Sequence, residues 1–116
     1  MMDRKRTHTE WADINIDRYE RCKNRLLNRD YRPGEAPMLL LQCYRNLYGA
    51  EINYLDANIP GIEFRQFGYR ECKRLRLNFA AVIEDLMGRS AYNLDVGPLV
   101  MQALTSTAPM DRDNGC

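Results

Sequence analysis

The side chains with the widest chemical range in this sequence are four thiols and one imidazole. The cysteines are Cys22, Cys43, Cys72 and Cys116, and the histidine is His8. No two cysteines form a Cys-x-x-Cys pair, the spacing typical of zinc sites and of thiol redox sites. The first three cysteines fall among apolar positions of predicted helices, so we expect free, buried thiols in a reducing compartment. A disulfide framework or a zinc site is the alternative.

Sequence patterns that would indicate catalysis are missing. The chain has no nucleophile-elbow or phosphate-loop motif, and His8 has no second candidate metal ligand near it in sequence. No carboxylate pair has a placement that the sequence defines. We therefore predict that the protein is not an enzyme, holds no cofactor or metal, and has no small-molecule substrate. Any effect on chemistry would then act through the conformational equilibrium of a partner.

The most basic segment follows Gly68, where a predicted helix presents cationic side chains on one side with Glu71 as the only acidic residue. Cationic side chains neutralise phosphates, and an aromatic ring stacks on an unpaired base. Because the net charge is only +1, RNA binding would depend on this local patch. The alternative is an ordinary solvated helix face. The candidate RNA-binding residues are Arg65, Tyr69, Arg70, Lys73, Arg74 and Arg76.

The length of 116 residues is that of one domain. No run of 18 apolar residues occurs, so we expect no transmembrane helix and no membrane partner. The basic N-terminal segment has no apolar stretch behind it, so a secretory signal is not expected either. We expect residues 1–12 and 107–116 to be flexible tails on either side of a domain at residues 13–106.

The predicted elements are helices with short strands between some of them. Pro37 suits the first turn of a helix and Gly49 suits the position just past its end, while Asp13 or Asn15 suits the N-cap of the preceding helix. This order predicts an α+β fold, a winged helix-turn-helix with a three-helix core, a small β-hairpin wing and an added C-terminal helix. The elements are a helix at Asp13–Leu27, a helix at Pro37–Tyr48, a strand at Glu51–Tyr54, a helix after Gly68, a hairpin within Ala80–Val96 and a helix at 98–106.

Two segments resemble the signature of the LOTUS domain, also called OST-HTH. They are Y-R-x-L-x-G at Tyr44–Gly49 and I-E-F-R-Q-F-G-Y at Ile62–Tyr69, followed by Leu75. The segment Y-N-L-D-V at Tyr92–Val96 is similar to the wing of that family. The added C-terminal helix resembles the extended subtype, which occurs in Oskar and in germline Tudor-domain proteins.

This resemblance implies a non-catalytic adaptor that binds, and can stimulate, a Vasa-type DEAD-box RNA helicase in cytoplasmic germ granules, perinuclear granules or germ plasm. In the extended subtype, the second helix and the added helix together form the helicase-binding surface. Both helices here carry more apolar surface than a small domain needs, which independently favours a partner. The alternative is that the last helix covers the hairpin or the first helix. The implied partner-binding residues are Met38, Leu41, Gln42, Arg45, Tyr48, Leu99, Met101, Gln102 and Leu104.

A homodimer is a further expectation. Some members of the family dimerise through the wing and the third helix. The predicted edge strand at Ala80–Asp85 carries no charge before Glu84, so it is not strongly protected against pairing with a second strand.

Overall fold

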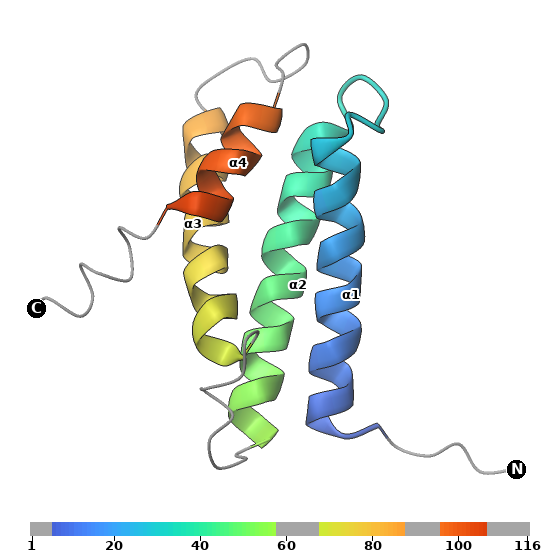
Figure 1. Ribbon diagram of the computed structural model, residues 1–116, viewed down its shortest axis with the longest axis vertical. Helices are drawn as coiled ribbons and strands as arrows, with labels where there is room; N and C mark the ends of the chain where they lie inside the picture. The colour runs from blue at the N-terminus through green and yellow to red at the C-terminus, as the bar shows by residue number, and fades with distance from the viewer. Residues whose placement is uncertain (1–5, 58–67, 88–95, 107–116) are drawn as a thin grey trace, which may run out of the picture.

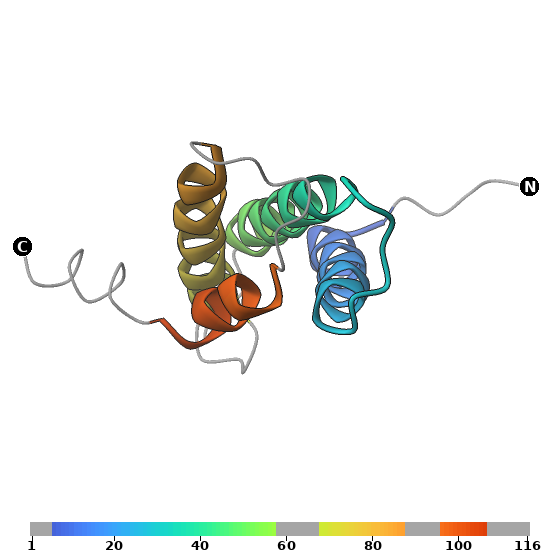
Figure 2. The same cartoon turned by 90° about the horizontal axis from the view of Figure 1, so that it is seen from above.

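In the described part of the chain, the regular secondary structure is entirely α-helical (Figure 1). The computed structural model describes residues 6–57, 68–87 and 96–106. The helices are α1 (His8–Leu27), α2 (Ala36–Ala57), α3 (Tyr69–Met87) and α4 (Gly97–Thr105). The three long helices stand side by side with α2 between α1 and α3, and the short α4 packs mainly against α3 and α1 (Figures 1 and 2).

The first helix begins at His8, within the segment predicted as an N-terminal tail. Its N-cap is Thr7, whose hydroxyl accepts a hydrogen bond from the Glu10 N–H at 3.1 Å, while the Glu10 carboxylate accepts one from the Thr7 N–H at 3.4 Å. This reciprocal capping box satisfies two N–H groups that a helix start leaves free. The predicted N-caps Asp13 and Asn15 therefore lie inside the helix, and that prediction is wrong.

The second helix does not end at Gly49 but continues to Ala57. Gly49 lies against α1, and a Cβ atom at this position would stand only 3.0 Å from the side-chain nitrogen of Asn15. The glycine therefore allows two helices to approach closely, which is a different role from ending a helix. The predicted strand at Glu51–Tyr54 is the last part of α2, and the prediction of a strand there is wrong.

The third helix likewise extends over the predicted first strand of the hairpin, because Ala80–Met87 is helical. The remainder of the predicted hairpin, residues 88–95, lies outside the described residues. A helical period along α3 places one row of side chains in the core, and this long row outweighs the short β-like run within it. The buried row is Cys72, Leu75, Phe79, Val82 and Leu86. The predicted α+β winged helix-turn-helix is therefore wrong, since the described fold is a four-helix arrangement.

The hydrophobic core lies between the three long helices and under α4. At its centre, the rings of Tyr19 and Phe79 meet edge to face, with centroids 6.0 Å apart. A smaller cluster lies near the start of α1, the end of α2 and the start of α3. It joins Ala12 of α1, Ala50 and Tyr54 of α2, and Cys72 of α3. Other fully buried members of the main cluster include Leu26, Leu40, Cys43, Leu47, Val96 and Val100.

Two polar side chains of α3, Arg76 and Asn78, join this helix to α2 and to α4. The Arg76 guanidinium donates to both oxygens of the buried Glu51 carboxylate, at 2.6 and 3.3 Å, and so joins α3 to α2. The Asn78 amide nitrogen donates to the carbonyl oxygens of Ala103 and Ser106, each at 2.7 Å. These last bonds satisfy free carbonyls at the C-terminal end of α4 and hold it on α3.

Replacing Glu51 with alanine is expected to lower the free energy of unfolding by about 2 kcal/mol, because the largely buried Arg76 guanidinium would lose its partner. Urea denaturation followed by circular dichroism measures this change. The matched control is Asp17→Ala, which removes the exposed ion pair to Arg21 and should cost less than about 0.5 kcal/mol. Equal costs for the two variants would contradict a structural role for the Glu51–Arg76 pair.

Candidate protein-interaction surface

The three cysteines of the described part are free and buried, as predicted, and Cys116 lies outside it. Burial raises the pKa of all three thiols, that of Cys72 to about 12, so they stay protonated and weakly nucleophilic near neutral pH. Within the described ranges, no group of three His, Cys, Asp or Glu side chains could hold a metal ion. None of the described helices is both long enough and apolar enough to cross a membrane.

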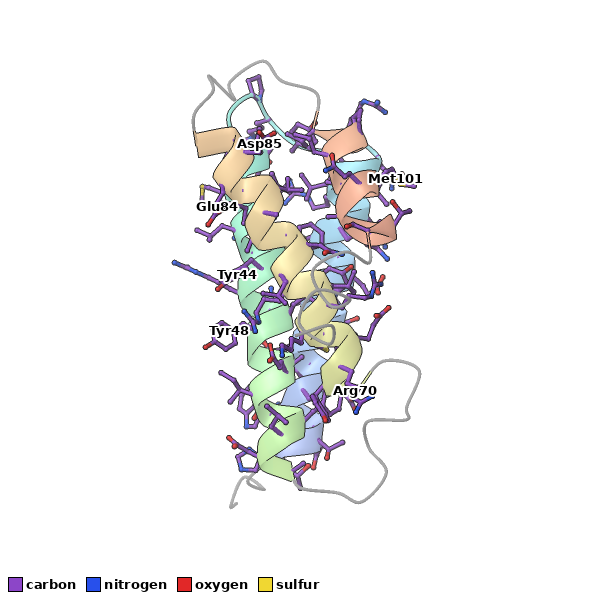
Figure 3. The ribbon with its side chains drawn as sticks, turned by 90° about the vertical axis from the view of Figure 1, so that its left-hand side faces the viewer. Tyr44, Tyr48, Arg70, Glu84, Asp85 and Met101 are labelled. Atoms are coloured by element: carbon purple, nitrogen blue, oxygen red, sulfur yellow. The ribbon has the colours of Figure 1, made fainter. Side chains whose placement is uncertain are left out.

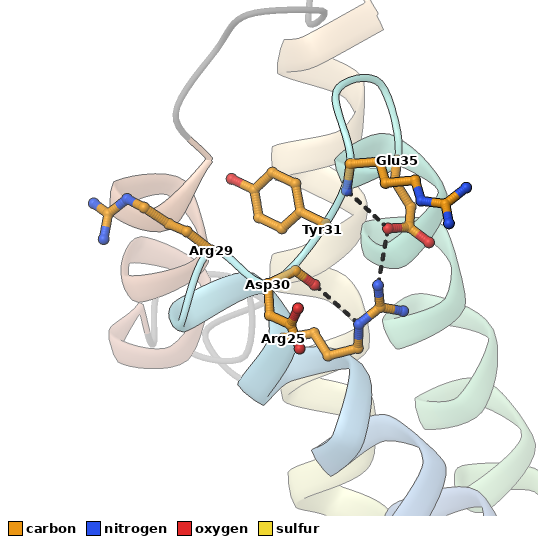
Figure 4. A pocket seen from close by; sticks show the side chains of 6 residues that line it. Arg25, Arg29, Asp30, Tyr31 and Glu35 are labelled. Atoms are coloured by element: carbon orange, nitrogen blue, oxygen red, sulfur yellow. Dashed lines mark hydrogen bonds and ion pairs between the residues drawn. The ribbon is translucent and has the colours of Figure 1, made fainter.

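A hollow of about 420 Å³ lies where α1 passes into α2 (Figure 4). The charged residues that line this hollow bind one another. Arg25 donates from Nη2 to Glu35 at 2.8 Å and from Nε to the Asp30 carbonyl oxygen at 3.0 Å. The Arg32 backbone N–H, with help from Arg25, lowers the pKa of the Glu35 carboxyl. Because these charged groups bind one another, they stabilise the connection between α1 and α2.

The predicted RNA-binding residues do not form one free basic face. Arg74 is bound to both oxygens of Glu71, at 2.6 and 2.9 Å, and also donates to the Ser106 carbonyl oxygen at 2.8 Å. Arg76 is bound to Glu51, an acidic residue that was predicted to lie in a separate strand. Arg76 is thus directed toward α2, and Arg74 toward the C-terminal end of α4.

The other members of that set are scattered. Tyr69 is half-buried against the smaller core cluster, Lys73 is half-buried, and Arg70 is exposed. Arg65 lies outside the described residues. The structure therefore leaves Arg70 as the one exposed cation of the predicted set within the described ranges.

The predicted partner-binding residues fall on two different faces. Those of α2, which are Met38, Leu41, Gln42, Arg45 and Tyr48, are all exposed. On α4, Met101 and Gln102 are exposed, while Leu99 and Leu104 pack against the core cluster.

The two groups do not meet, because α4 covers α1 and α3 and does not lie beside the exposed face of α2. In Figure 3, Tyr44 and Tyr48 lie at one edge of the molecule and Met101 lies at the other. The single surface that the LOTUS resemblance implied is therefore not formed.

The exposed apolar face of α2 is longer than predicted from the sequence. Of the seven large hydrophobic side chains that are exposed in the described part, five lie on this helix. Together with one arginine they recur at alternating spacings of three and four, which is the heptad pattern of a helix that packs against another helix. We call this row the outer stripe. It consists of Met38, Leu41, Arg45, Tyr48, Ile52 and Leu55.

Two members of the outer stripe were missed from the sequence, namely Ile52 and Leu55, which are 43% and 49% exposed. They were missed because the helix was ended at Gly49. The signal was present, since the heptad spacing continues without interruption past that glycine.

The centre of the outer stripe is held in place by neighbouring side chains. The Tyr48 ring meets the Tyr44 ring edge to face at 6.1 Å, and the Arg76 guanidinium lies 4.6 Å from the Tyr48 ring centroid. Arg76 is in turn fixed by Glu51. A side chain that is already ordered loses little conformational entropy on binding, so Tyr48 is suited to be an anchor.

Comparison with known proteins finds no match for the chain among protein-family models, curated proteins or solved structures.

The free energy of unfolding is expected to fall as the pH is raised from about 8 to 11. The unfolded chain releases thiol protons above a pKa of about 8.5, whereas the folded chain retains them, so each buried thiol contributes a slope of up to about 1.4 kcal/mol per pH unit. Urea denaturation of the wild type and of Cys72→Ala at several pH values measures this slope. An equally steep slope in the variant would show that Cys72 does not contribute.

Replacing Ile52 or Leu55 with glutamate is expected to change the free energy of unfolding by less than about 0.5 kcal/mol, because both side chains are exposed. The matched control on the same helix is Leu47→Ala, which empties a fully buried site and should cost about 3 kcal/mol. Urea denaturation at low protein concentration measures both. A cost for Ile52→Glu as large as that for Leu47→Ala would make the outer stripe part of the core.

Proposed function

We propose that this chain is a non-catalytic protein-interaction domain that binds a helix of another polypeptide along the outer stripe of α2. The observation that carries the proposal is the exposed heptad row of five large hydrophobic side chains. A helix laid along such a row places its own apolar side chains between those of α2, as in a coiled coil.

The fold itself does not need this row. The opposite face of α2 already supplies the core, through Leu40, Cys43, Leu47 and Tyr54. Single hydrophobic residues on a surface require no explanation, but several large hydrophobic side chains exposed along one helix face usually mark a binding site. From Met38 to Leu55 the row spans 17 helical steps, about 26 Å, which is long enough for several turns of a partner helix.

The LOTUS resemblance suggests a Vasa-type DEAD-box helicase as the first partner to test. In our proposal such a partner uses the outer stripe without α4, because Met101 and Gln102 lie on a different face. A place in germ granules would follow only from that partner. RNA binding is not proposed, because Arg74 and Arg76 are bound to Glu71 and Glu51.

A photo-crosslinking amino acid tests the proposal directly. With p-benzoyl-phenylalanine in place of Tyr48, irradiation in cells or with purified helicase core is expected to yield a defined adduct, because this position lies at the centre of the outer stripe. The crosslinked peptide of the partner, identified by mass spectrometry, should carry apolar residues at heptad spacing.

The control carries the same amino acid in place of Met101, which is 49% exposed on α4 and so matches the 42% exposure of Tyr48. Similar adducts from both positions, or none from position 48 in cells, would contradict the proposed function. Adducts in cells but none with purified helicase would exclude that helicase and retain the interaction domain.

A further inference from the structure

The outer stripe has the same spacing in both directions along α2. Its intervals are three, four, three, four and three residues, so the row is symmetric about a point between Arg45 and Tyr48. In a two-fold symmetric interface, if a residue of the first copy contacts a given residue of the second, the same contact occurs with the two copies exchanged. A two-fold axis through that midpoint, perpendicular to α2, pairs the row with itself in the antiparallel direction.

The residues that meet under this symmetry suit one another. Met38 of one copy meets Leu55 of the second copy, and Leu41 meets Ile52. These four side chains are all exposed and apolar in the single chain. Each contact occurs twice, so eight apolar side chains leave water in four layers, the main source of favourable free energy in an association of this kind.

The one charged residue of the stripe decides the direction. Arg45 is exposed and has no ion-pair partner among the residues that the structure describes. In a parallel pair, the two Arg45 side chains would face each other and repel. In the antiparallel pair, each Arg45 faces Tyr48 of the second copy, where a guanidinium over the ring is attracted by its π-system.

The Tyr48 ring already accepts one guanidinium, since Arg76 lies over it at 4.6 Å within the same chain. It is nevertheless still 42% exposed. The charge of Arg76 is balanced by Glu51, so the contact proposed with Arg45 of the second copy uses the exposed part of a ring that is ordered before association.

The neighbouring helix favours the same direction. α3 runs opposite to α2, so its end with Glu84 and Asp85 lies beside the start of α2 (Figures 1 and 3). The antiparallel symmetry places α3 on the same side in both copies, with the two helices running in opposite directions. The acidic end of one α3 then lies toward the basic end of the other, at Arg70 and Lys73.

We infer that the occupant of the outer stripe is a second copy of this chain, bound antiparallel about a two-fold axis that passes between Arg45 and Tyr48. This inference rests on the proposed function, because it names the helix that the interaction domain binds. It replaces the predicted homodimer through an edge strand, since Ala80–Asp85 is helical.

Analytical ultracentrifugation of the purified chain over a range of concentrations tests self-association. A reversible monomer–dimer equilibrium is expected, and Arg45→Glu should weaken it about ten-fold, because two cation–π contacts are lost. Met101→Glu, on α4, is the matched control and should leave the equilibrium unchanged. A chain that stays monomeric at several hundred micromolar, roughly the weak end of specific protein association, would overturn the inference.

Cysteine crosslinking tests the direction. In a Cys116→Ser background the remaining native thiols are buried, so an introduced surface thiol reacts first. An equimolar mixture of Leu41→Cys and Ile52→Cys chains should form a mixed disulfide dimer, whereas neither variant alone should crosslink efficiently. Efficient crosslinking of Leu41→Cys with itself would show parallel pairing and overturn the inference.

The two proposals fail in different ways. A monomeric purified chain whose position 48 still crosslinks to a different protein in cells overturns self-pairing and retains the interaction domain. An absence of adducts from position 48 together with a monomeric chain overturns both. Circular dichroism of every variant confirms that the helices are intact, as expected for changes at exposed positions.

Discussion

The burial of α2 between α1 and α3 is the contact on which the rest of the structure depends. α2 packs against both long neighbours, whereas these neighbours are joined to each other chiefly through it and through α4. Its buried face includes Leu40, Leu47 and Tyr54, and Gly49 lets α1 approach closely. Because α1 and α3 cover two sides of α2, a third side of this helix remains exposed to water. The position of the outer stripe is therefore set by the core on the other side of the same helix.

The Glu51–Arg76 pair connects this core to the surface. A buried ion pair often contributes little net stability compared with apolar packing, because both charges lose their hydration. Its effect here is positional, since the carboxylate fixes the guanidinium, and the guanidinium lies over the Tyr48 ring. One interaction thereby joins α2 to α3 and holds the guanidinium that lies over Tyr48, near the centre of the outer stripe. The same interaction means that Arg76 is already bound to a carboxylate within the fold.

Local patterns predicted part of this structure and long-range packing decided the remainder. Helical periodicity located the middle of each helix and the burial of Cys22, Cys43 and Cys72, because these depend on nearby residues. Gly49 was misjudged because a glycine looks the same in sequence whether it ends a helix or accommodates a neighbour, here Asn15 of α1. The segment Ala80–Asp85 was predicted as a strand because so short a stretch does not show the buried helical row that runs from Cys72 to Leu86.

The candidate surface was predictable to a similar extent. The exposure of Met38, Leu41 and Tyr48 followed from periodicity, whereas Ile52 and Leu55 were lost with the misplaced helix end. The position of α4 could not be read from its sequence, because an apolar helix does not specify which neighbour it covers. The ion pair between Arg76 and Glu51 joins residues 25 positions apart, and no local pattern predicts it.

The position of α4 bears on the interpretation of the exposed face of α2. α4 is the most apolar helix of the described part, and it could have covered the outer stripe. Instead it closes the opening between α1 and α3, where Asn78 and Arg74 bind its C-terminal carbonyl groups. In the part of the chain that the structure describes, the last helix therefore covers the core and leaves the outer stripe of α2 exposed to water. Exposure of such a row costs solubility unless another helix covers it, and its symmetric spacing suits a second copy of the same helix.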